Sequence, residues 1–146
     1  MTDQTAVTIV MIEDDEGHAR LIERNIRRAG ISNSIRHFTD GTTALDFLLN
    51  GQDGPVVNGP AMILLDLNLP DMSGIDILGK VKAHPKLKRT PVVILTTTDD
   101  KVEIQRCYDL GANVYITKPV NYESFADAIR QLGLFLSVMQ VPEVAP

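Results

Sequence analysis

Residues 61–74 read AMILLDLNLPDMSG, and this segment decides the fold because a continuously apolar run stops abruptly at the carboxylate of Asp66. The run AMILL has no alternating polar side, which predicts a strand covered on both faces, as in a parallel α/β sheet. The Asn, Pro and Ser-Gly residues that follow are typical of a turn. An acidic side chain at the carboxyl end of such a strand points into the crevice where open α/β sheets bind ligands, so Asp66 is a candidate reacting group. Taken alone, it could equally be a helix cap or a solvated turn residue.

Length and composition predict one soluble domain. The chain has 146 residues, of which 44% are hydrophobic and 23% are charged, and these values are ordinary for a globular protein. We expect a single domain over residues 1–141, with an extended C-terminal helix, and a disordered tail over residues 142–146. The sequence contains no apolar run near the roughly 20 residues of a membrane helix, and its N-terminus does not resemble a signal peptide. We therefore expect a cytoplasmic protein that does not contact a membrane.

The residue inventory excludes several kinds of site. Cys107 is the only cysteine, so an internal disulfide or a thiolate metal cluster is impossible. The three histidines, His18, His37 and His84, show no metal-ligand spacing. The net charge is −5 and the basic residues form no stripe, which argues against direct nucleic-acid binding.

Strand and helix patterns alternate along the chain. Apolar runs predict buried strands at residues 8–12, 61–65, 91–95 and 114–116, and a weaker strand at 34–38. Helical spacing predicts helices at about residues 16–29, 41–49, 75–83, 100–110 and 122–139, and residues 50–60 form an unusually long loop. This alternation predicts an α/β fold with a doubly wound, five-stranded parallel sheet and five helices that cover both of its faces.

The polar residues of interest gather at one edge of that sheet. Each lies at the carboxyl end of a predicted strand, where one crevice can collect them all: Glu13, Asp14, Asp66, Thr96 and Lys118. Three adjacent carboxylates repel one another unless protons or a cation neutralise them, and an all-oxygen ligand set suggests Mg²⁺. A lysine and a threonine nearby suit the oxygens of a phosphoryl group, and a carboxylate nucleophile can form an aspartyl phosphate. We therefore favour phosphoryl transfer onto Asp66.

Plainer roles exist for several of these residues. Asp14 or Asp15 could simply cap the first helix, and Lys118 alone would be a surface charge. Position preferences favour turn and cap roles for other acidic residues, namely Asp71, Asp99 and Asp100.

Four ordered motifs resemble the receiver domain of two-component response regulators. They are IEDD at residues 12–15, LDLNLPDMSG at 65–74, LTT at 95–97 and TKPV at 117–120, and the resemblance covers about residues 7–135. It implies the flavodoxin-like, CheY-like strand order 2-1-3-4-5 and a phosphoryl group that passes from a histidine kinase to Asp66. The implied chain is a signalling protein and not an enzyme.

The resemblance also implies individual roles. Mg²⁺ would be held by Asp14, Asp66 and the main-chain carbonyl of Asn68, while Glu13 acts through a water molecule of the metal. Three further residues are similar to the switch hydroxyl, the switch aromatic and the phosphate-contacting lysine of the family: Thr96, Tyr115 and Lys118. Family members usually have a cis peptide bond before the proline at position 119.

Two positions depart from the family pattern. Thr97 follows the switch threonine where the family often has a smaller residue, so its β-branched side chain bears on the lifetime of the phosphoryl group. Glu13 replaces the commoner Asp, a change that many receivers carry.

Three other functions compete with this interpretation. A hydrolase of the haloacid dehalogenase type needs a second acid two residues after its nucleophile, where this chain has Asn68. A flavodoxin-like FMN carrier needs a phosphate-binding loop after the first strand, and the acidic residues 13–16 would repel phosphate. The third is an interaction module that never receives phosphate, which ranks lower because all the key residues are present.

The sequence also suggests partners. Because the chain ends soon after its last helix, we expect output through contacts with an unknown downstream protein. The long loop and the extended C-terminal helix resemble single-domain receivers that partner with phytochrome histidine kinases. An apolar stripe of Leu134, Val138 and Val141 lies opposite the core-facing side of the last helix, which predicts a homodimer through that helix.

Overall fold

The computed structural model describes residues 7–28, 30–49, 61–97 and 100–117, together with Asp127, Arg130 and Gln131. Several expectations fall outside these residues and stay predictions: the loop at 50–60, Lys118 and the bond to Pro119, Asp99, the stripe of Leu134, Val138 and Val141, and the tail. Asp127, Arg130 and Gln131 are helical and lie within the predicted last helix.

Five parallel strands form one sheet in the order β2-β1-β3-β4-β5, which confirms the predicted doubly wound topology. The strands are β1 (Thr8–Ile12), β2 (Ile35–Phe38), β3 (Ala61–Leu65), β4 (Val92–Thr96) and β5 (Val114–Thr117). The part of the chain that is described also contains the helices α1 (Glu16–Arg28), α2 (Gly41–Leu49), α3 (Gly74–Ala83) and α4 (Lys101–Asp109).

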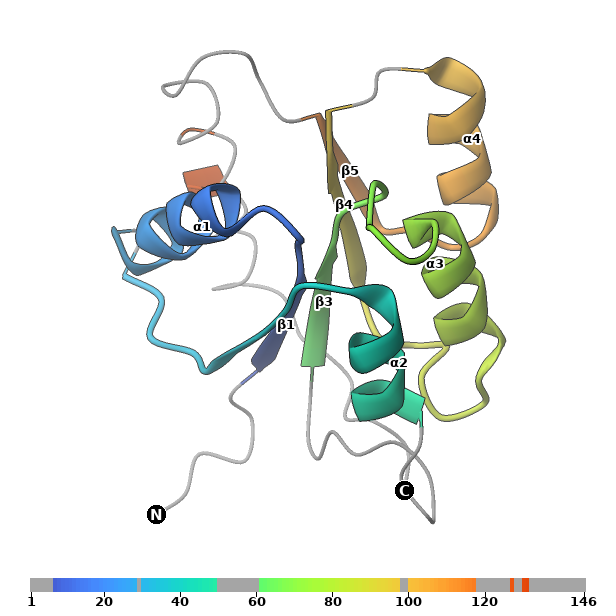
Figure 1. Cartoon of the computed structure of the whole chain (residues 1–146), viewed down its shortest axis with the longest axis horizontal. Coiled ribbons are helices and arrows are strands. Elements are labelled where there is room, and N and C mark those ends of the chain that lie inside the picture. Colours follow the sequence, from blue (N-terminus) through green and yellow to red (C-terminus); the bar gives the residue numbers. More distant parts are fainter. Residues whose placement is uncertain are drawn as a thin grey trace.

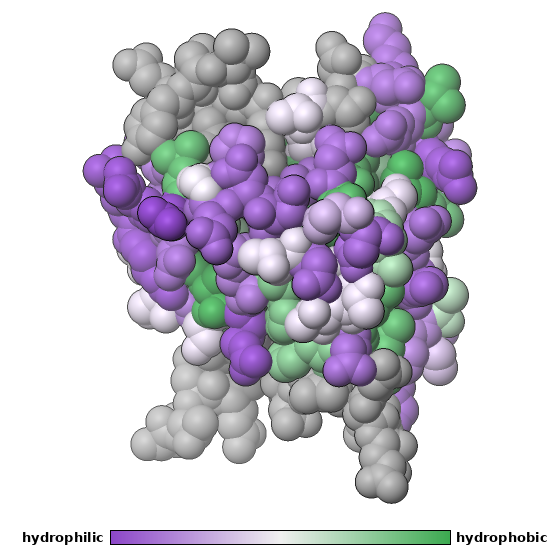
Figure 2. Space-filling view, in the orientation of Figure 1, coloured by the Kyte–Doolittle hydropathy of each residue, from purple (hydrophilic) through white to green (hydrophobic). Residues whose placement is uncertain are grey.

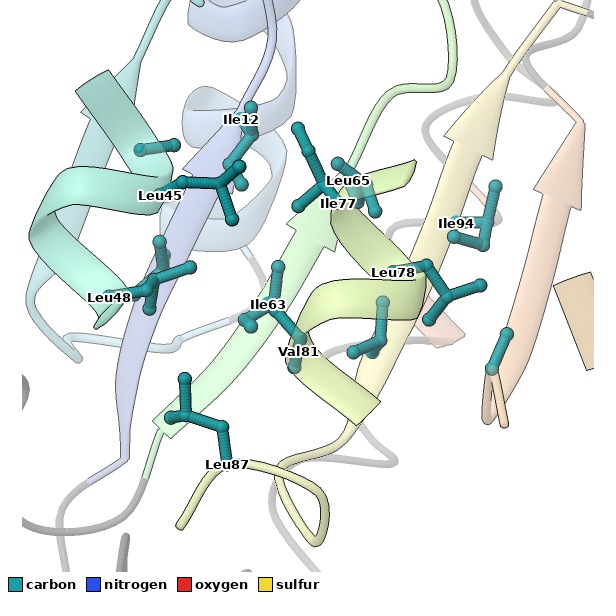
Figure 3. Packing of buried hydrophobic residues seen from close by; sticks show 14 of the residues in the cluster. Ile12, Leu45, Leu48, Ile63, Leu65, Ile77, Leu78, Val81, Leu87 and Ile94 are labelled. Atoms are coloured by element: carbon teal, nitrogen blue, oxygen red, sulfur yellow. The ribbon is translucent and has the colours of Figure 1, made fainter. Parts of the chain in front are cut away.

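The helices lie on both faces of the sheet, with α1 on one side and α2, α3 and α4 on the other (Figure 1). Alternate residues of a strand point to opposite faces, so each central strand contributes to two separate cores. On one face Ile9, Met62 and Val93 pack with α1 residues such as Ile22 and Ile26. On the other face the strand residues Ile12, Ile63, Leu65 and Ile94 lie beneath Leu45 and Leu48 of α2 and Ile77, Leu78 and Val81 of α3 (Figure 3).

The burial pattern explains why the sequence signal differed between strands. All five residues of β3 and of β4 are buried, as expected for central strands of a parallel sheet. The edge strand β2 exposes Arg36 and His37 in its middle, which is why its apolar run is short. Charged side chains on a short edge strand also disfavour pairing with another chain.

One boundary differs from the sequence prediction in a way that affects the site. The strand predicted at residues 91–95 runs instead from Val92 to Thr96, and Thr96 pairs with Thr117 of β5. Thr96 is therefore the last residue of β4 and is completely buried, whereas its apolar neighbours alone had suggested a strand ending one residue earlier.

Side chains cap the N-termini of helices α1, α3 and α4. Asp15 accepts a hydrogen bond of 2.9 Å from the His18 amide at the start of α1. Ser73 accepts one of 3.2 Å from the Ile75 amide, and Asp100 one of 2.9 Å from the Val102 amide. Each cap contributes about 1 kcal/mol to helix stability. Asp15 and Asp100 thus have the capping roles that the sequence analysis allowed for them.

On the face shown in Figure 2, the described surface is mainly hydrophilic with scattered apolar residues. Across the described ranges, no helix has both the length and the apolar character needed to cross a membrane.

Candidate functional site

Three predicted carboxylates meet at the carboxyl ends of β1 and β3. These strands are neighbours, with Ile12 paired to Leu65, and the Asp66 amide donates a 3.0 Å hydrogen bond to the Ile12 carbonyl. Carboxylate oxygens of Glu13, Asp14 and Asp66 all lie within 4.8 Å of one another. Glu13 is only 1% exposed and Asp66 only 5%, while Asp14 faces solvent. Sheet register therefore brings together acids that are more than fifty residues apart in the sequence.

This donor set fits a hard divalent cation. Two buried carboxylates and an exposed third at such short range repel one another, and a cation between them would remove that repulsion. Carboxylate oxygen is the ligand that Mg²⁺ prefers, and Mg²⁺ commonly keeps several waters, for which the exposed side of Asp14 leaves room. The residues present therefore suit Mg²⁺ or a similar ion.

The loop after β3 returns sharply to α3. The Asn68 amide donates a 3.1 Å hydrogen bond to the Asp66 carboxylate, Asn68 forms a bridge with Ser73, and the Gly74 amide donates to the Leu67 carbonyl at 2.9 Å. These contacts fix the backbone that follows Asp66. The first residue of α3 must be glycine because a Cβ at position 74 would overlap the Asp66 carbonyl oxygen.

Thr96 reaches the same site from β4. The Asn68 side-chain amide lies 3.4 Å from the Thr96 hydroxyl oxygen and donates to it. Thr97 is exposed beside it, so its β-branched side chain lies at the surface. Tyr115 lies on β5 opposite Ile94, is half-buried, and packs against the core on the α2 to α4 face. Lys118 follows β5 directly and lies beyond the described part of the chain.

Two contacts at the site had no signal in the sequence. The Asp71 carboxylate accepts hydrogen bonds from the amides of Gly41, at 2.9 Å, and Thr42, at 2.8 Å, and from the Thr42 hydroxyl. The Thr42 hydroxyl, followed by the two amides, lowers the pKa of the Asp71 carboxyl from 3.8 to about 2. The other contact joins His37 Nε2 to the Glu13 carbonyl oxygen at 2.8 Å. The sequence analysis assigned Asp71 to a turn or cap, and the structure shows that it caps a helix distant in sequence.

An open groove of about 600 Å³ runs beside the acid cluster. The loop of residues 67–73 forms most of its wall, and Asp14, Ile75 and Glu103 of α4 complete the lining. The exposed carboxylate of Asp14 is therefore accessible to a ligand that enters along this groove.

Comparison with known proteins agrees with this geometry. A family model described as the response regulator receiver domain matches residues 9–130. A crystal structure of a response regulator receiver domain from Rhodospirillum rubrum is 71% identical, with a TM-score of 0.91, and covers 96% of this chain and 100% of its own. Response regulator Rcp1 from Synechocystis sp. is 34% identical over 129 residues, which are 87% of this chain and 86% of the relative.

Two further similar structures contain a bound metal ion or a phosphorylated protein. The Mn²⁺-bound form of response regulator Rcp1 has a TM-score of 0.85 at 31% identity, covering 93% of this chain and 99% of that one. The phosphorylated cyanobacterial phytochrome response regulator RcpA has a TM-score of 0.84 at 32% identity, covering 94% and 99%. With its sheet order, its acid cluster and a family match over most of its length, this chain belongs to the response regulator receiver domain family.

Proposed function

We propose that this chain is a single-domain response regulator whose Asp66 accepts a phosphoryl group from a histidine kinase. The observation that carries the proposal is the buried Asp66 carboxylate at the end of a central strand, with the oxygens of Glu13 and Asp14 within 4.8 Å. An Asp66 carboxylate oxygen attacks phosphorus, the new P–O bond forms as the P–N bond to the kinase histidine breaks, and the electron pair of that bond returns to the imidazole.

The residues around Asp66 suit that reaction. Asp14, Asp66 and the main-chain carbonyl of Asn68 would hold Mg²⁺, with Glu13 acting through a water molecule of the metal. The bound ion would neutralise negative charge on the carboxylates and on the incoming phosphoryl oxygens. The related Rcp1 has been crystallised with Mn²⁺, which supports a divalent-metal site in this family. Lys118 would supply a positive charge to the phosphoryl oxygens and Thr96 a hydroxyl donor.

Signalling would follow from a change on the β4, α4 and β5 face. The added oxygens of the phosphoryl group would attract the Thr96 hydroxyl, and the half-buried Tyr115 could turn into the space that this hydroxyl vacates. Helix α4 exposes Val102 at 78% and Tyr108 at 45%, so this helix offers apolar area to a downstream protein. Output through protein contacts is consistent with this surface.

A phytochrome histidine kinase is the proposed phosphodonor, because the structurally similar protein RcpA is a phytochrome response regulator. We also propose a homodimer through Leu134, Val138 and Val141, the apolar stripe predicted for the C-terminal helix.

The first test is labelling by a small phosphodonor such as acetyl phosphate in the presence of Mg²⁺, followed by intact-protein mass spectrometry. We expect one phosphoryl group on the wild type and none on Asp66→Asn. Asp76→Asn is the matched control, since Asp76 is an exposed carboxylate in the first turn of α3 and should not affect labelling.

The result also separates the competing functions. Label on Asp66→Asn would show that another residue accepts phosphate. An unlabelled wild type would favour the interaction module that works without phosphate, and steady release of inorganic phosphate from a phosphate monoester would favour a hydrolase. Transfer from a phosphorylated phytochrome kinase to wild type, and not to Asp66→Asn, tests the proposed donor.

A further inference from the structure

One short segment contacts both loops that carry the acid cluster. Residues 37–42, the end of β2 and the first turn of α2, are here called the β2–α2 brace. One loop, residues 13–15, follows β1, and the other, residues 66–73, follows β3. The described side chains of the brace are not part of the acid cluster itself.

The brace holds the first loop through the main chain of Glu13. His37 Nε2 lies 2.8 Å from the Glu13 carbonyl oxygen, and a carbonyl can only accept, so Nε2 carries the proton. The Glu13 amide donates to the Phe38 carbonyl at 2.9 Å. Both polar main-chain groups of Glu13 are therefore bound to the end of β2.

The brace holds the second loop through Asp71. Its carboxylate accepts from the Gly41 and Thr42 amides and from the Thr42 hydroxyl, and these donors are 29 or 30 residues away in sequence. Two amides at a helix N-terminus and a hydroxyl form charge-assisted bonds with an ionised carboxylate, which are stronger than bonds between neutral groups.

Side-chain packing also joins the start of α2 to the second loop. A Cβ on Gly41 would lie 2.5 Å from Met72 Cγ and 2.9 Å from Ile77 Cδ1, so the start of α2 touches the second loop directly. Both the hydrogen bonds to Asp71 and the close packing of Met72 at Gly41 therefore hold the loop against α2.

We propose that Asp71 and His37 are positioning residues that fix the spacing of the two acidic loops through the β2–α2 brace and thereby set the affinity of the site for a divalent cation. The inference rests on the proposed function, in which these loops hold Mg²⁺. Small ions with strict geometry bind well only when their ligands are placed within a few tenths of an ångström, roughly 0.2 Å. Outer residues that orient ligands change metal affinity by about 10- to 100-fold when they are mutated.

The test is Mn²⁺ binding to the unphosphorylated protein, with free Mn²⁺ measured by electron paramagnetic resonance. We expect Asp71→Ala to weaken binding by about tenfold, the lower end of the range for such residues. Asp71→Asn keeps one acceptor oxygen and should lie between Asp71→Ala and wild type. His37→Ala should also weaken binding, because the Glu13 carbonyl loses its donor.

Asp40→Ala is a control at the same helix end. Asp40 accepts from the Thr43 amide at 2.6 Å and from the Thr43 hydroxyl at 3.1 Å, so it caps α2 from its own turn and does not hold the second loop through these bonds. It should lower thermal stability as Asp71→Ala does, yet leave the Mn²⁺ affinity within about twofold of wild type, because the ligand loops are not displaced.

The inference is overturned if Asp40→Ala and Asp71→Ala weaken Mn²⁺ binding equally, or if neither Asp71 variant changes it while circular dichroism shows a folded protein. Asp66→Asn separates this failure from failure of the proposed function. A wild type that binds no Mn²⁺ would overturn both proposals, as would wild-type affinity in Asp66→Asn. If Asp66→Asn binds Mn²⁺ more weakly while the Asp71 and His37 variants bind it as wild type does, only the proposed role of the β2–α2 brace is overturned.

Discussion

Replacing Gly74 by alanine should damage both the stability of the domain and its phosphorylation. Gly74 begins α3 where this helix presses against the end of β3. A methyl group there would overlap the Asp66 carbonyl oxygen and lie 2.7 Å from Leu67 Cα and 3.1 Å from the Asp66 carbonyl carbon. These are main-chain atoms of a buried strand end, which cannot rotate away as a flexible side chain can.

The size of the effect follows from these distances. Carbon atoms make ordinary contact at about 3.5 Å, so the Leu67 contact alone requires a shift of roughly 0.8 Å. Overpacking of this kind typically costs about 1–3 kcal/mol. For a domain of this size each kcal/mol lowers the Tm by about 3 °C, so we expect Gly74→Ala to melt about 3–9 °C below wild type.

The same displacement should slow phosphorylation more than the loss of stability explains. The clash pushes on the backbone of Asp66 and Leu67, and a misplacement of about 1 Å at a reacting group can lower a rate by about 100-fold. We expect the labelling rate to fall by at least about tenfold at a temperature where the variant is fully folded. The assay pairs thermal unfolding by circular dichroism with the initial rate of labelling by acetyl phosphate.

Gly79→Ala is the matched control in the same helix. A Cβ at position 79 meets no other atom within 4 Å, and alanine is favoured over glycine inside helices by about 0.5–1 kcal/mol. This variant should melt slightly above wild type and label at the wild-type rate. If Gly74→Ala is as stable as Gly79→Ala, or if it labels normally, then close packing of α3 against the strand end does not position Asp66 and the reasoning is refuted.

Two further predictions concern titratable groups. Cys107 is buried, and this burial, reinforced by the nearby charge of Glu103, raises the pKa of its thiol. Native protein should therefore resist alkylation by iodoacetamide at neutral pH and react once urea unfolds it, and rapid labelling of the native state would contradict the buried placement. The pKa of Asp71 is lowered from 3.8 to about 2, so its contribution to stability is present above about pH 4 and is lost as the pH falls toward 2. The Tm difference between wild type and Asp71→Asn should shrink over that interval, and a constant difference would show that the Asp71 charge does not matter.

The sheet and the acid cluster could be predicted because local patterns in the sequence are enough to identify the strands and the acids at their ends. Continuous apolar runs identify buried central strands, and parallel strands place their carboxyl ends at one edge, so Glu13, Asp14 and Asp66 had to meet once the topology was assumed. The structure confirms the strand order and brings these three carboxylates together. Their roles in phosphorylation stay predictions.

The contacts that hold the site together could not be predicted from the sequence, because they join segments that are distant in sequence. An aspartate in a turn predicts a local cap, and nothing near Asp71 shows that its partners are Gly41 and Thr42. The place of Thr96 was also misjudged by one residue, because a polar residue after VVIL suggests a strand end although it pairs with Thr117. Such contacts depend on how the helices pack on the sheet and not on the conformational preference of any single residue.

The residues that a local motif predicts and the contacts that it does not predict belong to different parts of the site. The groups that would bind phosphate lie at strand ends. The sheet fixes their positions there, and short sequence motifs identify them. Their fine spacing depends on α2 and α3, through the Asp71 bonds and the close approach of Gly74. Both helices pack on the same apolar core as Ile12 and Leu65, the residues that immediately precede the acids of β1 and β3 (Figure 3). A mutation in that core, for example at Leu45 or Ile77, would therefore affect the acid cluster by moving the two helices, although neither residue is charged.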